Sequence, residues 1–408
     1  MKNDIRHAKQ QACKKAFILL LSTITVLLCL VVGGVQISRA LYKPVIGFLD
    51  VPENVREAIE KIIITENNKS NKSWKSVIID PSLKLPELNK VFKKTDILIT
   101  KTGARAEALA SVESPNQKSL LLIPTTIRSA AILNNRQYGI PILLDHFELA
   151  WDSTNPVSYN FSPKSTLKQL EQIANNREEK TTWPFMCAGA DDESLLSLIG
   201  ALTEVLGSET AWESSKQDAK TTEPVDLVRK ESFSSAIKIL LRWRREGLLH
   251  PEWFRMTNAD VEAFMETGTA PFVFMSLSNH RKIKQRTIEK YNSVFIPGLN
   301  LDAHRSLTIP SIVLITPIKK RVSKESIFIK DALLNDKVQT QLSIMTGLAP
   351  ASSSAAAPDR QANEARLWAA ASERPLPSFF TALYPDPADT ALFAKQIREL
   401  LQTNGAEN

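Results

Sequence analysis

The sequence predicts an α/β fold built on a parallel sheet, and three observations support this prediction. Residues 45–49, 77–79 and 97–99 are apolar runs of the length that buried strands have. A helical spacing of apolar side chains follows the first run, and residues 85–92 form a predicted helix between the other two. Strands and helices that alternate at these lengths form a parallel sheet covered by helices on both faces.

The composition is that of a folded protein with more than one core. The chain has 408 residues, of which 43% are hydrophobic and 23% charged. It is too apolar to be disordered, and it is long enough for two domains or for one domain with two lobes. Cys13 and Cys29 lie in the first 40 residues, so Cys187 is the single thiol of the predicted folded part and no disulfide can form there.

The formal net charge of +7 is concentrated at the N-terminus. Residues 1–40 hold six Lys and Arg residues against a single acidic residue, Asp4, and the rest of the chain is almost balanced. A nucleic-acid-binding surface needs a strong excess of basic side chains. We therefore expect no nucleic-acid partner for the folded part.

An export segment is predicted at the N-terminus. Residues 16–35 carry no charge and would reach about 30 Å as a helix, enough to cross a bilayer. Basic residues precede this run, so the body is expected at the periplasmic or extracellular face of the bacterial cytoplasmic membrane. Two interpretations stay open: an uncleaved anchor over residues 16–37, or a signal peptide cut near Ala40 that leaves the body secreted. Leu28 before Cys29 argues against a lipid anchor.

Further along the chain, the periodicity predicts more helices. Apolar stripes predict helices over 195–207 and 233–247, each ending at a glycine. The polar stretch 208–230 is predicted to be an exposed loop. Residues 351–358 (ASSSAAAP) form a low-complexity link, and an apolar stripe over 393–401 predicts a last helix.

No HExxH, GxSxG, P-loop or CxxC motif occurs, so we predict a protein that is not an enzyme. Asp145, His146, Glu148 and Asp152 lie close together in sequence and contain metal-binding groups. In an extended segment, however, Asp145 points away from His146 and Glu148, so we expect no metal there and no other cofactor. Cys187 precedes a predicted helix start, which favours a reactive thiolate, but a buried inert thiol is the commoner case.

Five segments occur in an order that resembles a known protein family. They are Tyr138 to Asp152 (YGIPILLDHFELAWD), Pro163 to Leu170 (PKSTLKQL), Leu240 to Pro251 (LLRWRREGLLHP), Phe264 to Ala270 (FMETGTA) and Val338 to Pro350 (VQTQLSIMTGLAP). Together they resemble the motifs of the family 1 extracellular solute-binding proteins, the maltose-binding-like receptors of ABC importers.

The resemblance implies a two-lobed, type II-like periplasmic-binding-protein fold with a hinge, preceded here by the N-terminal hydrophobic helix. The implied parts are lobe one (43–147 with 300–350), lobe two (153–295 with 351–405) and hinge crossovers (148–152 and 296–299). Such receptors capture a small solute between the lobes and close around it. The resemblance further implies a carbohydrate solute, ABC permease subunits as partners and a monomeric receptor.

Candidate ligand contacts come first from the loops after the first and third predicted strands, because open parallel sheets bind ligands there. Asp50 follows the first strand, and Lys101 and Thr102 follow the third. Each also has a structural alternative, since Asp50 could cap the next helix and Lys101 could simply be solvated.

The resemblance adds candidates near the first crossover. Asp145 matches a position that often meets ligand in the family, and His146 and Glu148 lie beside it. Hydrogen bonding within the hinge is the alternative role for all three. Trp151, also in this segment, is placed either in the cleft or in the core.

The stacking positions for a sugar depart from the family. Ser276 and Ser278 stand where sugar-binding members have Gly and Trp, so one aromatic platform is absent. Ser276 and Trp183 remain candidates for ligand contact, with core packing as the alternative role of Trp183.

Two functions stay open at this point. The first is an extracytoplasmic receptor that captures a solute and delivers it to an ABC importer. The second is a membrane-tethered ligand sensor or protein-interaction module on the same fold, without transport, which the missing tryptophan also permits. Fold alone does not decide between them.

Overall fold

The computed structural model describes residues 43–70, 73–109, 122–133, 136–177, 183–300, 305–316, 323–372 and 374–403. From Val45 onward the chain forms one compact unit. No helix among the described residues is long and apolar enough to span a bilayer. The export segment predicted over residues 1–40 lies outside the described residues.

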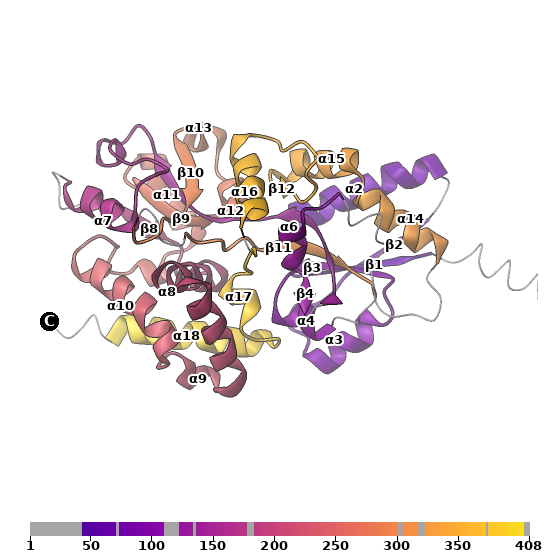
Figure 1. Cartoon of the computed structure of the whole chain (residues 1–408), viewed down its shortest axis with the longest axis horizontal. Helices are drawn as coiled ribbons and strands as arrows, with labels where there is room; N and C mark the ends of the chain where they lie inside the picture. Colours follow the sequence, from indigo (N-terminus) through magenta and orange to yellow (C-terminus); the bar gives the residue numbers. More distant parts are fainter. Residues whose placement is uncertain are drawn as a thin grey trace, which may run out of the picture. The chain divides into compact units, whose positions relative to one another are not determined.

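The first lobe is built on a six-stranded sheet in the order β12-β6-β11-β3-β1-β2 (Figure 1). Its strands are β1 (Val45–Leu49), β2 (Lys75–Ile78), β3 (Ile97–Lys101), β6 (Ile140–Leu144), β11 (Ser311–Ile315) and β12 (Ala349–Pro350). β1 pairs in parallel with β2 and β3, which confirms the predicted parallel core. The sheet as a whole is mixed, because β11 runs antiparallel to β3 and β6.

Helices pack on both faces of this sheet. Ile97 and Ile99 of β3 point to one core cluster and Leu98 to another, as alternation along a strand requires. The first cluster includes side chains of α2 (Glu53–Ser70), α14 (Lys324–Leu333), α15 (Asp336–Thr346) and α16 (Arg360–Ala371). The second includes side chains of α3 (Leu85–Phe92), the helix predicted over the same residues, and α4 (Ala104–Leu109).

The second lobe is built on a four-stranded sheet in the order β10-β7-β9-β8. Its strands are β7 (Phe147–Asp152), β8 (Phe185–Cys187), β9 (Phe272–Ser276) and β10 (Tyr291–Phe295). Its core includes side chains of α7 (Leu167–Asn175), α8 (Asp192–Thr221), α10 (Glu231–Arg245), α11 (Asn258–Thr267), α17 (Phe379–Ala382) and α18 (Pro387–Thr403). α10 and α18 confirm two of the helices predicted from apolar stripes.

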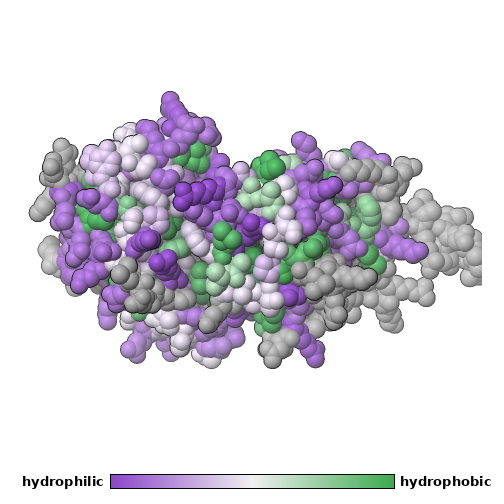
Figure 2. All heavy atoms as spheres, turned by 45° about the horizontal axis from the view of Figure 1, so that its top comes forward, coloured by the Kyte–Doolittle hydropathy of each residue, from purple (hydrophilic) through white to green (hydrophobic). Residues whose placement is uncertain are grey.

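Short elements complete the described chain. They are α6 (Thr125–Ser129), α9 (Pro224–Leu227), α12 (Leu277–His280), α13 (Gln285–Ile288), the paired strands β4 (Ile132–Leu133) and β5 (Arg136–Gln137), and single 3₁₀ turns at Pro156–Ser158 and Trp253–Arg255. Figure 2 shows hydrophilic side chains over most of one face, with apolar side chains in small separate groups.

The predicted loop over 208–230 is wrong, because α8 continues to Thr221. Ser208 itself is not helical (φ 64°, ψ −177°), so one helix ends at Gly207, as predicted, and a second continues to Thr221. Beyond the kink, Trp212 is fully buried and packs on Phe379 at a ring distance of 5.6 Å. The stretch was predicted as a loop because most of its side chains are polar. Only a few buried side chains pack its helix against the second lobe.

Three segments of the chain cross from one lobe to the other, and they lie side by side. The first runs from β6 to β7 through residues 145–146, the second lies between β10 and β11, and the third between α16 and α17. Backbone hydrogen bonds join the second to the first, as in Phe147 N to Thr308 O at 3.0 Å. They also join it to the third, as in Ile309 N to Leu376 O at 2.8 Å.

These crossings shift two of the expected boundaries. Residues 148–152, expected as a hinge crossover, lie within strand β7, and the chain crosses just before it. The segment 351–405, expected in lobe two, is shared, because Ala362, Ala365 and Ala369 of α16 pack in the core of the first lobe. We infer that the hinge lies at residues 145–146, 305–310 and 374–378.

Candidate functional site

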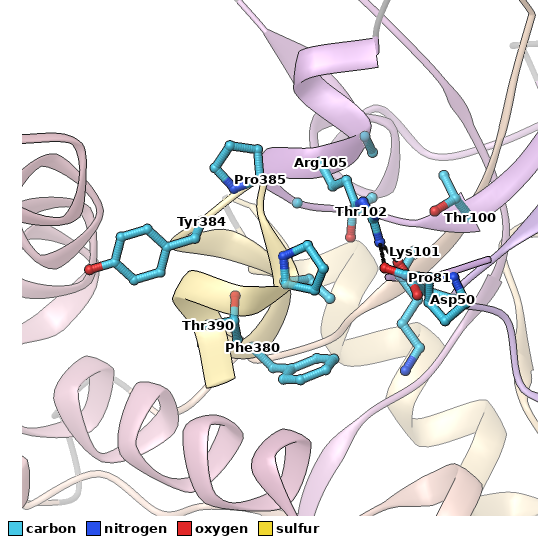
Figure 3. A pocket seen from close by; sticks show the side chains of 14 residues that line it. Asp50, Pro81, Thr100, Lys101, Thr102, Arg105, Phe380, Tyr384, Pro385 and Thr390 are labelled. Atoms are coloured by element: carbon cyan, nitrogen blue, oxygen red, sulfur yellow. Dashed lines mark hydrogen bonds and ion pairs between the residues drawn. The ribbon is translucent and has the colours of Figure 1, made fainter. Parts of the chain in front are cut away.

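A cavity of about 130 Å³ lies where the first lobe meets α17 and α18 (Figure 3). Its wall on the first lobe is formed by the residues after β1 and β3, and its wall on the second lobe by the residues from Phe380 to Thr390. The side chains that matter for its chemistry are Asp50, Lys101, Thr102, Arg105, Phe380 and Tyr384. The structure therefore brings together the three residues predicted from the strand ends.

Asp50 and Arg105 form an ion pair on the first lobe. Asp50 Oδ2 accepts from Arg105 Nη1 at 3.1 Å, and the same Nη1 donates to the Pro81 carbonyl at 2.7 Å. Burial raises the pKa of Asp50 above its ordinary value, and the Arg105 cation limits that rise. The Asp50 carboxylate thus faces Arg105 and the cavity, and the alternative role as a helix cap does not describe these contacts.

Lys101 forms an ion pair that joins the lobes. It lies at the end of β3, and its Nζ is 2.5 Å from Oε1 of Glu193 in the first turn of α8. Burial alone would lower the pKa of Lys101, but the carboxylates around it, Glu193 foremost, hold the pKa above its ordinary value. Lys101 is therefore a cation that the opposite lobe neutralises.

Two further contacts join the lobes beside the cavity. Lys216 Nζ of α8 lies 2.8 and 3.1 Å from the two carboxylate oxygens of Glu107 on α4. Gly103 approaches Thr381 of α17 so closely that a Cβ at Gly103 would lie 2.2 Å from the Thr381 carbonyl oxygen. The lobes are in direct van der Waals and ionic contact here.

Thr102 has a structural role that fixes the end of β3. Its N–H donates to the Ser311 carbonyl at 2.8 Å, and its hydroxyl oxygen accepts from the Ser311 N–H at 3.2 Å. Thr102 is fully buried, so it contributes to the cavity wall mainly by holding Lys101 and Gly103 in place.

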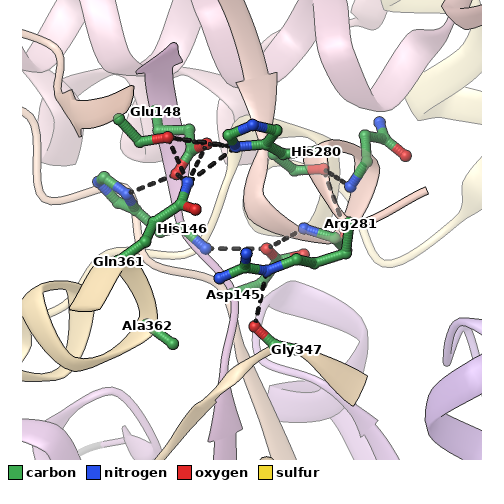
Figure 4. Close-up of polar contacts among 12 residues, drawn as sticks. Asp145, His146, Glu148, His280, Arg281, Gly347, Gln361 and Ala362 are labelled. Atoms are coloured by element: carbon green, nitrogen blue, oxygen red, sulfur yellow. Dashed lines mark hydrogen bonds and ion pairs between the residues drawn. The ribbon is translucent and has the colours of Figure 1, made fainter. Parts of the chain in front are cut away.

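Asp145, His146 and Glu148 are buried at the first crossing and do not line the cavity (Figure 4). The Asp145 carboxylate accepts from the N–H of His146 at 2.9 Å and from the N–H of Ser278 at 3.0 Å. Burial raises the pKa of Asp145, and its charge contributes to the raised pKa of Lys101. The alternative role, hydrogen bonding within the hinge, describes these contacts.

Glu148 is the centre of a buried polar cluster. Its carboxylate accepts from His280 Nδ1 at 2.6 Å, from the Ser293 hydroxyl at 2.7 Å and from Gln361 Nε2 at 2.7 Å. Burial alone would raise the pKa of Glu148, but the imidazoles of His146 and His280 outweigh it, so the pKa lies well below its ordinary value. The cluster joins α16 to the second sheet. Among the described residues, no group of three or more His, Cys, Asp or Glu side chains could hold a metal ion.

The remaining candidates lie in other places. Trp151 is buried in the second core and packs edge-on against Phe161, so it takes the core position, one of the two left open for it. Trp183 packs on His250 at a ring distance of 4.3 Å, before the start of β8. Ser276 caps α12 by accepting from the Asn279 N–H. None of the three belongs to the described lining of the cavity.

Sequence reasoning missed the residues that the opposite lobe supplies. Phe380 is half-buried, with its ring on the second core and in the cavity wall, and Tyr384 follows one turn later. In the sequence, only the dense aromatic group in SFFTALYP could have pointed to them. Glu193 was within a predicted helix start, but nothing local relates it to Lys101.

We expect Lys101 and Glu193 to be strongly coupled. In a double-mutant cycle of Lys101→Met and Glu193→Gln, the two losses in unfolding free energy should be non-additive by about 0.5–3 kcal/mol. Chemical denaturation of the four proteins measures this. Additive losses would show that the pair contributes nothing to holding the lobes together.

Comparison with solved structures extends over most of the chain. The bacterial solute receptor AcbH, which has an exclusive preference for β-D-galactopyranose, superposes with a TM-score of 0.68 at 10% identity, over 88% of this chain and 96% of that one. A chitin oligosaccharide binding protein gives a TM-score of 0.64 at 14% identity, over 90% and 98%. The sugar-binding protein MalE of Xanthomonas citri gives 0.65 at 12%, over 88% and 96%. The chain has the two-lobed solute-binding fold.

This solute-binding fold confirms the fold that the sequence motifs implied. At the level of sequence, no protein-family model and no curated protein matches the chain. Within the solute-binding fold, the cavity described above lies between the two lobes, at the carboxyl ends of β1 and β3, where open α/β sheets bind ligands.

Proposed function

We propose that this protein binds a carbohydrate in the cavity between its lobes. The observation that carries the proposal is the balanced charge of the cavity. Two cations, Lys101 and Arg105, are each paired with a carboxylate, Glu193 and Asp50. A sugar hydroxyl both donates and accepts hydrogen bonds, so it can contact a carboxylate and a cation at once.

A charged solute suits this cavity less well. An added anion or cation would leave one of the paired side chains without its partner in a partly buried place, which costs free energy. A neutral solute with many hydroxyls keeps both pairs and replaces the water around them. The half-buried ring of Phe380 adds the planar apolar surface on which the C–H face of a sugar packs.

Binding between the lobes provides the mechanism. A solute that contacts both walls stabilises the closed arrangement by its differential affinity for it. We further propose that the closed, monomeric receptor delivers its sugar to the permease subunits of an ABC importer on the outer side of the cytoplasmic membrane. The sugar-binding proteins that share the fold support this proposal.

A ligand screen tests the proposal. The full-length chain, purified in a detergent without a sugar headgroup, is screened by thermal shift against sugars, polyols, amino acids and metal ions. A sugar at 100 times its dissociation constant should stabilise the fold by about 2.7 kcal/mol. No shift with any sugar would overturn the proposal and favour the tethered interaction module.

Asp50→Asn locates the binding in the cavity. Loss of this carboxylate should weaken binding of the sugar that binds best at least tenfold, which corresponds to about 1.4 kcal/mol of binding free energy. Calorimetry measures this affinity. Asp80→Asn is the matched control, because Asp80 follows β2 as Asp50 follows β1 but is exposed, hydrogen-bonds with Ser82 and lies outside the cavity lining.

A further inference from the structure

The chain enters the first sheet at the edge that lies opposite the cavity. β1 begins at Val45, which pairs with Lys75 at the start of β2. On the other side of β1, the Val45 N–H donates to the Asp96 carboxylate at 2.8 Å, and the Asp96 N–H donates to the Val45 carbonyl at 2.7 Å. Asp96 directly precedes β3. The point of entry therefore lies between the starts of β2 and β3.

Exposed lysines flank this point of entry on both sides. Lys75 is the first residue of β2, Lys90 lies in the last turn of α3, and Lys93 and Lys94 follow α3 on the way to β3. All four side chains are exposed. Within the described part of the chain, no carboxylate forms an ion pair with any of them. We call these four lysines the entry surface.

The carboxylates at this edge do not neutralise the entry surface. Asp96 is 6% exposed, and its carboxylate accepts from the Val45 N–H. Glu66, near the end of α2, is half-buried and has a contact of its own. By contrast, the lysines between the lobes, Lys101 and Lys216, each have a carboxylate partner. The entry surface thus presents positive charge to the solvent.

The predicted anchor brings a membrane to the same edge. On the uncleaved interpretation the hydrophobic segment ends at residue 37, and Val45 follows eight residues later. Eight residues span at most about 29 Å when fully extended. The attraction between a lysine and an anionic lipid surface acts within a Debye length, which is about 10 Å at 0.1 M salt. The tether therefore keeps the entry surface close to the headgroups.

We propose that the entry surface docks on the anionic phospholipid headgroups of the membrane that holds the anchor. A lysine ammonium binds a phosphate oxygen as a point charge, so docking needs no fixed geometry of the lipid. A nucleic acid or an acidic protein would meet the same charges, but the tether holds the bilayer alone within constant reach. This inference takes the uncleaved anchor of the two interpretations, and it is independent of the sugar site.

Docking at this edge sets the orientation of the first lobe. β1 and β3 begin at the entry surface and end at Asp50 and Lys101, which line the cavity. A strand of five residues is roughly 16 Å long, so the cavity is held clear of the headgroups. The first lobe then stays fixed on the membrane, and closure moves the second lobe toward it.

Acetylation of single lysines tests the proposal on the full-length protein reconstituted in lipid nanodiscs. Acetic anhydride, a neutral reagent, modifies exposed lysines, and mass spectrometry gives the rate at each one. With about 30% phosphatidylglycerol and about 50 mM salt, the entry surface should react at least about threefold more slowly than in pure phosphatidylcholine. The difference should disappear at about 0.5 M salt, which screens the attraction.

Exposed lysines of the second lobe are the internal control. In Figure 1, α7 of that lobe lies at the opposite end of the molecule from β2. The control lysines also lack a carboxylate partner among the described residues, and they are Lys164, Lys168 and Lys238. Equal rates at the entry surface in the two lipids, or the same slowing at the control lysines, would overturn the proposal. No sugar takes part, so either result leaves the proposed function standing.

Charge reversal shows whether the protection comes from docking. Lys93→Glu combined with Lys94→Glu should restore fast acetylation of Lys75 in phosphatidylglycerol nanodiscs, because the reversed charges repel the headgroups. Lys164→Glu combined with Lys168→Glu is the matched control, with the same change of net charge on the second lobe, and should leave Lys75 slow. Circular dichroism checks that both variants are folded. If Lys75 stays slow in the first variant, the proposal is wrong.

Discussion

Replacing Gly103 with alanine should abolish solute binding while leaving both lobes folded. The new Cβ would lie 2.2 Å from the Thr381 carbonyl oxygen and 2.6 Å from its carbon, which are backbone atoms that cannot rotate away. Gly103 also has φ +141°, a conformation that residues with a Cβ rarely adopt. The lobes have separate cores, so the chain relieves the clash by holding them apart.

Two measurements follow the separation of the lobes. Small-angle scattering should give a larger radius of gyration for Gly103→Ala than for the wild-type protein, with or without sugar. Calorimetry should show a loss of affinity well beyond tenfold, or more than about 1.4 kcal/mol. An unchanged radius together with unchanged affinity would show that the contact between Gly103 and Thr381 does not govern closure.

Gly268→Ala is the control for backbone strain. Gly268 also has a positive φ, of +71°, but an added Cβ there meets nothing within 4 Å. Both substitutions therefore carry a backbone strain of roughly 1–3 kcal/mol, and only the one at Gly103 adds the clash between lobes. The control variant should lose a little stability and keep its affinity.

Replacing Glu148 with alanine should cost about 3–5 kcal/mol of unfolding free energy at neutral pH. Glu148 is fully buried, and its removal leaves the donors of His280, Ser293 and Gln361 without their acceptor. Chemical denaturation measures the loss. Glu53→Ala, at an exposed ion pair with Arg56, is the control and should change stability by less than about 0.5 kcal/mol.

The contribution of Glu148 should depend on pH. Its pKa in the folded protein lies below the ordinary value of 4.5, so its stabilisation is complete above that pH and is lost as the pH falls through the folded pKa. The difference in unfolding free energy between the wild-type protein and Glu148→Gln should therefore shrink below pH 4.5. A difference that grows in acid would show that the carboxylate is protonated in the folded state.

The sequence predicted the site residues that follow strands of the first sheet, because their positions depend on local sequence patterns. Asp50 and Lys101 follow strands, and the strands of a parallel sheet end at the same edge, so their positions could be derived from the apolar runs. Glu193 and Phe380 belong to the second lobe. Their approach to Lys101 depends on how two separately packed lobes meet, which no local pattern records.

The aromatic residue that lines the cavity was not among those predicted from the sequence. Trp151 and Trp183 resembled stacking platforms, yet one is buried in the core and the other packs on His250. Phe380, the ring that does line the cavity, sits in a short helix with no family motif. In the same way, Trp212 is a single buried side chain in a polar stretch, too sparse to reveal the second half of α8.

The order of the strands also constrains how the protein can fold during synthesis. The first sheet begins with β1 at Val45 and is completed only by β12 at Ala349–Pro350, and α16 covers its core later still. All four strands of the second sheet are synthesised in between. β1, β2 and β3 can pair with one another early, but the outer edge of β3 stays unpaired until β11 (Ser311–Ile315) has been made, and such long-range pairing is slow and prone to aggregation. Chaperone binding during synthesis should fall mainly on β3, before β11 arrives to pair with its outer edge.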